Sequence, residues 1–345
     1  MHVGDDGTTD RERASAAWAT IRTMIRPATR WRRPQLLDGP WSGAGRAAVW
    51  PLSQVLAAGV DLARAGWIDP AEVEELLAIL DVYRDGDGYG PFPGERPRYY
   101  DDNAWLALDL LDAATVLRAE HLVDGAARLL RFIREGEHPE GGVYWVESPR
   151  RSRHTCSTAP AGLVATGLAP HVGRAEREDL ERFAARCDAF LTRSLRRRDG
   201  LYADKVDDDG ARDEAVYAYN QGTPVALAMA RYEATGERSH LDGARATARA
   251  SLAHFDDADG DRRWHHEPCF NAIWLRNLRA LAPHAPADDI ARIEATIRLY
   301  ADRLWRDGRN PRTGWFTEGG IGRYDRGGVL DQAGVVQVLV LAARP

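Results

Sequence analysis

The most constraining feature of this chain is a short loop that recurs between pairs of helical segments. Each copy has Gly or Asp-Gly followed closely by an aromatic residue. The copies are Gly88-Tyr89, Gly142-Val143-Tyr144-Trp145, Asp199-Gly200-Leu201-Tyr202, Asp259-Gly260 leading to Trp264, and Gly314-Trp315-Phe316, with Gly39-Pro40-Trp41 as a further candidate. Their spacing of about 47 to 60 residues is typical of a repeated helical hairpin.

Between these loops the apolar residues follow a helical period, and strand alternation is nearly absent. The pattern predicts twelve helices, or six hairpins, at residues 10–26, 45–65, 70–83, 100–118, 121–136, 156–170, 174–197, 214–235, 238–255, 267–282, 287–306 and 328–343. We therefore expect an all-α protein with one domain over residues 1–345, in which residues 1–9 are disordered.

Repeated helical hairpins can form either an open solenoid or a closed ring. Solenoids tend to have closely similar repeats and polar end caps. Here the repeats share little beyond the loop, and the last predicted helix is strongly apolar from Val329 to Leu341. Six hairpins that close on themselves form an (α/α)6 toroid, and this is the predicted fold.

Composition excludes several classes of protein. The net charge is -6 and no long Lys/Arg block is present, so nucleic acid is not an expected partner. No apolar run reaches the ~18 residues of a membrane span. The N-terminus lacks the apolar segment of a secretory signal, which predicts a cytoplasmic protein. Aromatic residues with polar edges predominate, with 11 Trp and 11 Tyr against 7 Phe, as in sugar-binding clefts. The sequence carries no indication of the oligomeric state.

No metal or cofactor site is indicated. Cys156, Cys187 and Cys269 are an odd number without Cys-x-x-Cys spacing, which argues against a disulfide framework and against zinc. His265-His266-Glu267 lacks the i, i+4 spacing of helical zinc ligands. The aspartate-rich loops lack the Gly and the distal Glu of a calcium-binding EF-hand. The chain also lacks a P-loop and a Gly-x-Ser-x-Gly elbow.

Two adjacent carboxylates, Asp101 and Asp102, are the candidate catalytic residues. They follow a Gly/Pro-rich loop and precede an apolar-periodic run, which places them in the first turn of a helix. Adjacent carboxyls titrate as a coupled pair, so one can be ionised while the other keeps its proton. The alternative is structural, with Asp101 as an N-cap and Asp102 as a first-turn charge. A magnesium motif of the prenyl-diphosphate type would need a further carboxylate one turn on, where Trp105 stands.

If the glycine loops all lie at one rim of the ring, the segment after each loop brings its polar and aromatic residues to that rim. These residues are Trp50, Ser53 and Gln54; Asp101, Asp102 and Trp105; Arg153, His154, Thr155 and Thr158; Tyr217, Tyr219, Asn220 and Gln221; Phe270, Asn271 and Trp274; and Tyr324, Asp325, Asp331 and Gln332. Large amides beside apolar helices need hydrogen-bond partners. A concave, aromatic-lined bowl with convergent polar groups is the usual geometry of a ligand site.

Several separated blocks resemble one known family. Tyr99-Tyr100-Asp101-Asp102-Asn103-Ala104-Trp105 is similar to the signature of glycoside hydrolase family 76, the endo-α-1,6-mannanases. The other similar blocks are Val49-Trp50-Pro51-Leu52-Ser53, Gly141-Gly142-Val143-Tyr144-Trp145, Asp199-Gly200-Leu201-Tyr202-Ala203-Asp204, Tyr217-Ala218-Tyr219-Asn220-Gln221-Gly222-Thr223 and Phe270-Asn271-Ala272-Ile273. Together they span roughly residues 40 to 343 in the same order as in the family.

The resemblance implies an (α/α)6 fold and retaining hydrolysis of α-1,6-linked mannose in a polysaccharide or glycoconjugate. It implies that Asp101 is the nucleophile and Asp102 the general acid/base, without a cofactor. Retaining hydrolysis needs two carboxyl groups about 5–5.5 Å apart, which neighbouring residues can provide because their Cα atoms are about 3.8 Å apart. The predicted substrate-binding residues are Trp50, Tyr100, Asn103, Trp145, Asp204, Tyr219, Asn220, Gln221, Phe270, Asn271 and Tyr324.

The chain departs from the family pattern at two places. Arg153-His154 stands where the family usually has Lys-Asn, and Leu106 follows Trp105 where a second Trp is common. These departures concern the substrate more than the reaction. Two alternatives from other classes stay open: a non-catalytic glycan-binding toroid, and a sugar isomerase that uses His154 or His266 as its base.

Overall fold

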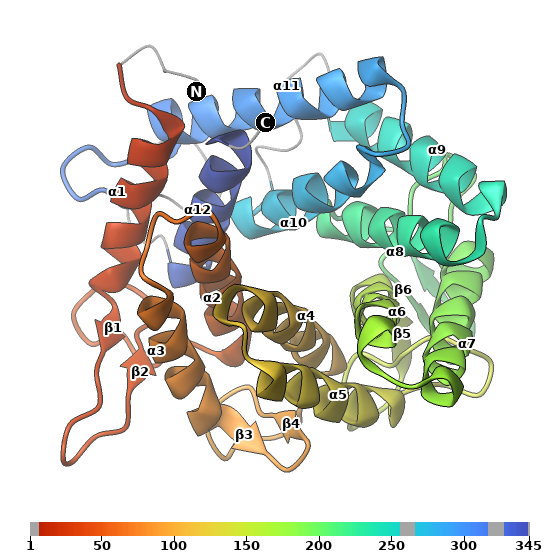
Figure 1. Ribbon diagram of the computed structural model, residues 1–345, viewed down its shortest axis with the longest axis horizontal. Coiled ribbons are helices and arrows are strands. Elements are labelled where there is room, and N and C mark those ends of the chain that lie inside the picture. Colours follow the sequence, from red (N-terminus) through yellow and green to blue (C-terminus); the bar gives the residue numbers. More distant parts are fainter. Residues whose placement is uncertain (1–6, 256–265, 317–327, 344–345) are drawn as a thin grey trace.

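The computed structural model describes residues 7–255, 266–316 and 328–343, and these form a ring of helices (Figure 1). The inner helices are α2 (Val49–Arg64), α4 (Tyr100–Leu117), α6 (Thr155–Leu168), α8 (Tyr219–Thr235), α10 (Pro268–Leu278) and α12 (Val329–Ala343). The outer helices are α1 (Asp10–Arg22), α3 (Pro70–Leu80), α5 (Glu120–Arg134), α7 (Arg174–Phe190), α9 (Arg238–Phe255) and α11 (Ala287–Arg303).

The inner ring is closed, since each of its helices packs against the next and α12 packs against α2. Five hairpins each join an inner helix to the outer helix that follows it in the chain. The sixth has a different origin, because α12 from the C-terminal end packs against α1 from the N-terminal end. The fold is therefore the predicted (α/α)6 toroid, with its ring closed by the two ends of the described chain.

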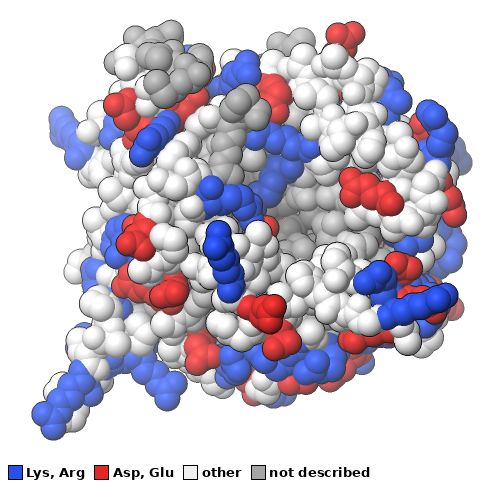
Figure 2. All heavy atoms as spheres, viewed as in Figure 1, with Lys and Arg blue, Asp and Glu red and all other residues white. Residues whose placement is uncertain are grey.

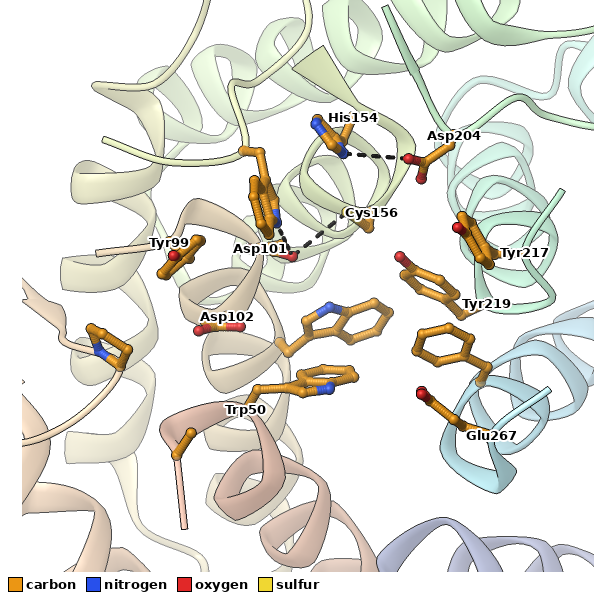
Figure 3. Close-up of a pocket in the computed structure, with 15 residues that line it drawn as sticks. Trp50, Tyr99, Asp101, Asp102, His154, Cys156, Asp204, Tyr217, Tyr219 and Glu267 are labelled. Atoms are coloured by element: carbon orange, nitrogen blue, oxygen red, sulfur yellow. Dashed lines mark hydrogen bonds and ion pairs between the residues drawn. The ribbon is translucent and has the colours of Figure 1, made fainter. Parts of the chain in front are cut away.

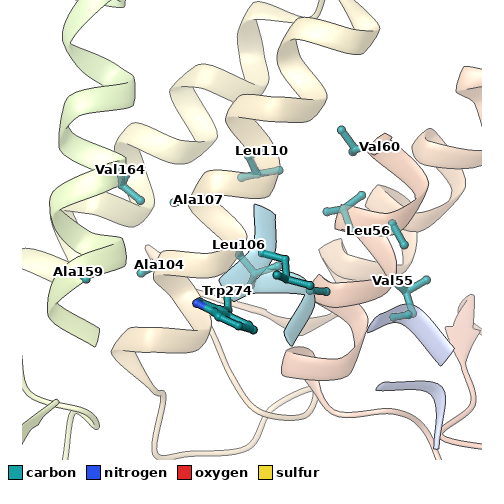
Figure 4. Close-up of a cluster of buried hydrophobic side chains, with 14 of the residues drawn as sticks. Val55, Leu56, Val60, Ala104, Leu106, Ala107, Leu110, Ala159, Val164 and Trp274 are labelled. Carbon is teal, nitrogen blue, oxygen red and sulfur yellow. The ribbon is translucent and has the colours of Figure 1, made fainter. Parts of the chain in front are cut away.

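Inner and outer helices differ in which faces they bury. In α12 every residue from Val329 to Ala342 is buried except Leu330, as expected for a helix with protein on all sides. The outer helices bury one apolar stripe and expose charged residues, as α5 and α7 do. Small residues such as Ala104 and Ala159 let the inner helices approach one another around larger side chains of the core (Figure 4). At Gly222 a Cβ atom would lie 2.7 Å from the Cα atom of Trp274, so glycine permits the contact between α8 and α10.

Buried amides hold the recurring loops to the inner helices. Asn103 of α4 accepts a hydrogen bond from the backbone N–H of Tyr89 at 2.7 Å and donates to its carbonyl at 3.1 Å. Gln221 of α8 makes the same pair of bonds to Tyr202, and Gln332 of α12 makes it to Phe316. In each case the partner is an aromatic residue one or two positions after the loop glycine. The predicted loop repeat is thus a repeated tertiary contact, which we call the amide clamp (Asn103, Gln221 and Gln332).

Short antiparallel strands lie in the connections between the helices. Two pairs are β1 (Ile25–Arg26) with β2 (Gln35–Leu36), and β3 (Arg84–Asp85) with β4 (Gly88–Tyr89). The third sheet has the order β5 (Ser152–His154), β6 (Lys205–Asp207) and β7 (Arg212–Asp213). This sheet joins the segment before α6 to the loop before α8, so it fixes one wall of the ring.

Helix boundaries differ from the predicted ones where loop contacts compete with the helix. The helix predicted over 214–235 begins at Tyr219, because the preceding segment extends from β7 and the Tyr217 carbonyl accepts from the Gln221 side chain. The helix predicted over 174–197 ends at Phe190 and continues as a π-helical turn, Leu191–Leu195. Thr9, predicted within a disordered segment, is the N-cap of α1 and forms a capping box with Glu12. Residues 1–6 lie outside the described part of the chain.

No helix in the described ranges is both long and apolar enough to cross a bilayer. All three cysteines, Cys156, Cys187 and Cys269, are buried and free of disulfide bonds. No cluster of His, Cys, Asp and Glu side chains with the arrangement of a metal site occurs among the described residues.

Candidate active site

A cavity of about 650 Å³ opens where the inner helices begin (Figure 3). Its walls combine seven aromatic side chains with four carboxyl groups. The lining residues are Ala48, Trp50, Pro91, Tyr99, Asp101, Asp102, Trp105, Trp145, His154, Cys156, Asp204, Tyr217, Tyr219, Glu267 and Phe270. The segments that precede or begin α2, α4, α6, α8 and α10 thus meet at one rim, as the repeat pattern predicts.

Asp101 and Asp102 lie in the first turn of α4 and face this cavity (Figure 3). The helix begins after Tyr99, which is extended and forms an isolated bridge with Val146. The Tyr100 N–H donates to the carbonyl of Trp145 at 2.8 Å, so the loop before α6 holds the start of α4 in place. The two carboxyls are therefore carried by a helix end that a neighbouring repeat fixes.

The two carboxyls have different surroundings. The Asp101 Oδ2 atom accepts a hydrogen bond of 2.9 Å from the indole Nε1 of Trp145 and a weaker one from the Cys156 thiol, with a donor–acceptor distance of 3.6 Å. The Asp101 Oδ1 atom is buried without a partner in the described structure. The Asp102 carboxyl receives no hydrogen bond from any described residue. Donors therefore favour a negative charge on Asp101, and nothing comparable favours it on Asp102.

These surroundings give the two carboxyls different pKa values. Burial raises the pKa of Asp101 to about 6, and the hydrogen bonds from Trp145, the Asp102 backbone and Cys156 oppose this rise. Burial raises the pKa of Asp102 well above its usual value, and the neighbouring charge of Asp101 raises it further. Asp101 therefore ionises first, and Asp102 holds its proton more tightly.

Trp145 is held by a stack with His154. Their ring centroids lie 5.4 Å apart with an interplanar angle of 24°. The His154 Nε2 atom is 2.8 Å from the Ser152 hydroxyl, and its Nδ1 atom lies 3.9 Å from Asp204. Burial, with a smaller effect of Lys205, lowers the pKa of His154 to about 4, so its ring is neutral at pH 7. A neutral imidazole stacked under the indole orients Trp145 toward Asp101.

Aromatic pairs form the remaining walls of the cavity. Trp50 and Trp105 lie on one side, with ring centroids 5.9 Å apart. Tyr219 lies across the cavity from the aspartates, with Tyr217 beside it (Figure 3). The Phe270 ring packs against Tyr219 at a centroid distance of 4.2 Å. Such ring faces, combined with polar edges, suit the alternating apolar and hydroxyl-bearing surfaces of a sugar.

The structure brings five of the predicted substrate-binding residues to the cavity, namely Trp50, Trp145, Asp204, Tyr219 and Phe270, and it buries a sixth, Asn220, behind the cavity wall. Asn220 is fully buried and donates to Asp204 at 3.0 Å, so it positions that carboxylate. Burial raises the pKa of Asp204, while this bond opposes the rise.

Four further predicted residues lie against packed protein and not against the cavity. Tyr100 is fully buried against Phe132, and its hydroxyl accepts from Arg150. Asn103 and Gln221 belong to the amide clamp, and Asn271 donates to the Tyr300 hydroxyl at 2.8 Å. The physical reason is the same for all four, because helix packing leaves them facing protein and not the opening. Tyr324 lies outside the described residues.

Sequence reasoning missed Glu267 and Cys156 as cavity residues, and it placed Tyr99 in the motif without assigning it to the site. Glu267 directly precedes Pro268, the first residue of α10. This position corresponds to the starts of the other inner helices, so the repeat could have identified it. Cys156 gives no such signal, because a buried thiol beside Asp101 is indistinguishable in the sequence from a thiol of the core.

A ring of six helical hairpins with an acidic pair under an aromatic-lined opening defines a carbohydrate-active enzyme of the (α/α)6 class. The family model described as glycosyl hydrolase family 76 matches residues 11–343. The chain belongs to this family, and it is a glycoside hydrolase.

Solved structures with the same fold agree with this placement. A mannosidase of family 76 from Bacteroides thetaiotaomicron is 20% identical, with a TM-score of 0.81 over 97% of this chain and 98% of that one. An α-1,6-mannanase from Salegentibacter is 20% identical, with a TM-score of 0.80 over 97% and 99% of the two chains. An inactive variant of that mannanase, solved with α-1,6-mannotriose, is 19% identical, with a TM-score of 0.81 over 97% and 99%. No curated protein matches the sequence.

Proposed function

We propose that this protein is a retaining hydrolase of α-1,6-mannosidic linkages, acting on a mannan-type polysaccharide or a mannose-containing glycoconjugate. The observation that carries the proposal is the pair of adjacent carboxyls that line the cavity, of which Asp101 accepts hydrogen bonds that favour its anion, whereas Asp102 accepts none from a described residue and so favours its acid form. Retaining hydrolysis requires such an anion and such an acid on one sugar linkage.

In the first step the Asp101 carboxylate attacks the anomeric carbon, and Asp102 gives its proton to the departing glycosidic oxygen. This forms a glycosyl ester on Asp101 and releases the first product. In the second step the ionised Asp102 takes a proton from water, and the resulting nucleophile breaks the ester bond. The sugar leaves with its original anomeric configuration, and both carboxyls return to their starting protonation states.

Donors on Asp101 suit the nucleophile, since Trp145 and Cys156 stabilise its anion before attack and after the ester is cleaved. The absence of such donors on Asp102 within the described structure suits a group that must hold a proton. The Salegentibacter variant solved with α-1,6-mannotriose is inactive and carries asparagine at two adjacent aspartates. By similarity, this supports the role of the pair and the linkage.

The shape of the site supports a substrate longer than one sugar. A second hollow of about 630 Å³ adjoins the cavity and shares Tyr99 and Trp145 with it. A chain of sugars bound across the aspartates can therefore continue past the Trp145 ring. This arrangement favours binding of an oligosaccharide within a longer polymer.

The test is a product profile from a panel of α-linked manno-oligosaccharides, followed by NMR of the anomeric protons. We expect cleavage of α-1,6 linkages with initial release of the α-anomer. Initial release of the β-anomer would contradict the retaining mechanism, and cleavage restricted to another linkage would contradict the substrate. Binding without any cleavage would support a glycan-binding toroid, and isomerised product without cleavage would support an isomerase.

A further inference from the structure

The connection between α1 and α2 forms a projecting hairpin of unusual charge. Residues 24–37 contain four arginines, Arg26, Arg30, Arg32 and Arg33, and no acidic residue, in a chain whose net charge is -6. In Figure 2 the hairpin is the projection at the lower left, where blue spheres occur without red ones. We call residues 25–36 the basic hairpin.

The tip of the basic hairpin is a defined turn. Thr29 and Arg32 exchange backbone hydrogen bonds of 2.9 and 3.3 Å, which leaves Arg30 and Trp31 as the two turn residues. Residues 26 to 33 are all exposed. The base is anchored, since Ile25 and Leu36 are buried and the Leu36 carbonyl accepts from the N–H of Ala47. The hairpin therefore presents a fixed surface on a rigid support.

Trp31 at the tip is 82% exposed, the largest exposure among the large hydrophobic residues of the described chain. An exposed indole combines a large apolar ring with a polar N–H group, which suits a boundary that is apolar on one side and wet on the other. The guanidinium of Arg30 lies 4.9 Å from the centroid of the Trp31 ring, so the apolar group and the positive charge form one unit.

No acidic side chain in the described part of the chain neutralises the charge of the hairpin. None of Arg26, Arg30, Arg32 and Arg33 forms an ion pair within the described residues, whereas Arg22 at the end of α1 pairs with Glu72 and Glu75. Four guanidinium groups on one short hairpin, without an acidic partner among the described residues, attract a polyanion through summed charge.

We propose that the basic hairpin is a docking element for an anionic lipid bilayer. Arginines interact with the phosphates of the headgroups, while an amphipathic indole ring enters the interface between headgroups and acyl chains. Each basic residue near an anionic surface strengthens binding about fivefold. The resulting attachment is peripheral and reversible, and it is weakened by salt.

The shape of the tip favours a bilayer over a nucleic acid or an anionic glycan. Bases and sugars are bound in grooves or on open aromatic platforms. Here the Trp31 ring stands on a convex turn, and Arg30 already lies over it. A flat lipid surface can receive such a tip without a groove. The attachment would also bring the catalytic rim near the membrane, since Ala47 contacts the hairpin and the adjacent Ala48 lines the cavity.

The test is flotation of the full chain with vesicles of phosphatidylcholine alone or with equal parts of phosphatidylglycerol. We expect binding only to the anionic vesicles, and its reversal by high salt. The variant Arg30→Gln/Arg32→Gln/Arg33→Gln should bind at least about a hundredfold more weakly, from the fivefold contribution of each arginine. Hydrolase activity on a soluble manno-oligosaccharide should be unchanged, because these residues lie outside the cavity.

The control is Arg198→Gln/Arg238→Gln/Arg298→Gln, which removes the same charge from exposed arginines that form no ion pair within the described residues. This variant should bind anionic vesicles like the wild type. Equal losses in the two triple variants would overturn the proposal, because net charge and not the hairpin would then determine binding. Equal binding of the wild type to neutral and anionic vesicles, or no binding to either, would also overturn it.

A second measurement addresses the indole. The difference between the emission spectra of the wild type and of Trp31→Phe should shift to the blue when anionic vesicles are added, because Trp31 enters a less polar environment. An unchanged difference spectrum on bound protein would contradict insertion of the tip. Tighter binding to a single-stranded oligonucleotide than to the vesicles, at equal phosphate concentration, would assign the hairpin to nucleic acid instead.

Discussion

The indole Nε1 of Trp145 donates a 2.9 Å hydrogen bond to Oδ2 of Asp101. This bond joins two repeats of the ring, since Trp145 belongs to the loop before α6 and Asp101 to the first turn of α4. It lowers the pKa of one member of an acidic pair whose burial raises both. The loop before α6 therefore helps determine which of the two carboxyls on the neighbouring helix α4 is ionised.

The first prediction concerns this bond. Trp145→Phe keeps an aromatic ring on His154 but removes the donor, and a hydrogen bond to a charged group contributes about 1.5–3 kcal/mol. We expect kcat/KM to fall about 10- to 100-fold and its acidic limb to move to higher pH. The measurement is a pH profile of kcat/KM. Trp50→Phe is the control, because Trp50 lines the same cavity without a hydrogen bond to either aspartate in the described structure. An acidic limb that stays in place in Trp145→Phe would show that the bond does not affect ionisation of Asp101.

The second prediction separates the roles of the two aspartates. Asp101→Asn removes the nucleophile and should abolish turnover of every substrate. Asp102→Asn removes the proton donor, which typically contributes about 10²–10⁴-fold. In kcat/KM, which reports the first step, its loss should be small for an aryl mannoside with an activated leaving group such as dinitrophenolate, and large for a manno-oligosaccharide. Rates measured on both substrates decide the assignment. If Asp101→Asn instead showed the dependence on the leaving group, the two roles would have to be exchanged.

The third prediction concerns stability and pH. The pKa of Asp101 is about 6 in the folded protein, above its usual value of 3.8. The folded state therefore binds this proton more tightly than the unfolded state, and stability falls as pH rises from the lower pKa through the higher one. Asp101→Asn should thus have little effect on stability near about pH 3, and should stabilise the protein by up to about 3 kcal/mol above about pH 7.

Urea unfolding across this pH range checks the third prediction. Asp242→Asn removes an exposed carboxyl on α9 and controls for the loss of one negative charge. A gain in stability that is equal at acidic and neutral pH would contradict the assigned cause. Together with the loss of turnover, a gain at neutral pH would show that the active carboxyl is retained at the expense of stability.

The helical ring and the acidic pair could be predicted because both are encoded locally. Apolar periodicity identifies the helices, the Gly-aromatic loops identify the repeat, and Asp101 and Asp102 adjoin one another in the chain. What local patterns leave open is the direction of a side chain at a helix start. Asn220 and Gln221 are adjacent and similar in chemistry, yet Asn220 supports Asp204 beside the cavity while Gln221 bonds to the loop at Tyr202. Only the packing of α8 distinguishes them.

Two further features depend on contacts between distant parts of the chain. The helices α1 and α12 pack together although they lie at opposite ends of the sequence. No short loop joins them, so the sequence pattern does not predict that they form a pair. The start of α8 at Tyr219 depends on the sheet in which β6 pairs with β5 from the segment before α6, and on the bond between Gln221 and Tyr202, and these contacts compete with an otherwise helical sequence. In both cases tertiary contacts override the local preference.

The fourth prediction tests whether the amide clamp is structural. Gln221→Met keeps a side chain of similar length but leaves the N–H and carbonyl of Tyr202 and the carbonyl of Tyr217 without their partner. Buried backbone groups without partners cost about 1–3 kcal/mol each, so we expect a loss of about 2–4 kcal/mol of unfolding free energy after partial rearrangement. At temperatures where the variant is folded, its kcat/KM should stay within about twofold of the wild type.

Two further variants serve as controls. Gln332→Met, in another repeat, should behave in the same way as Gln221→Met. Tyr219→Phe should change kcat/KM with little effect on stability, because its side chain lines the cavity. A Gln221→Met variant with intact stability and impaired turnover would instead return Gln221 to the substrate-binding residues, as its place at the helix start suggests.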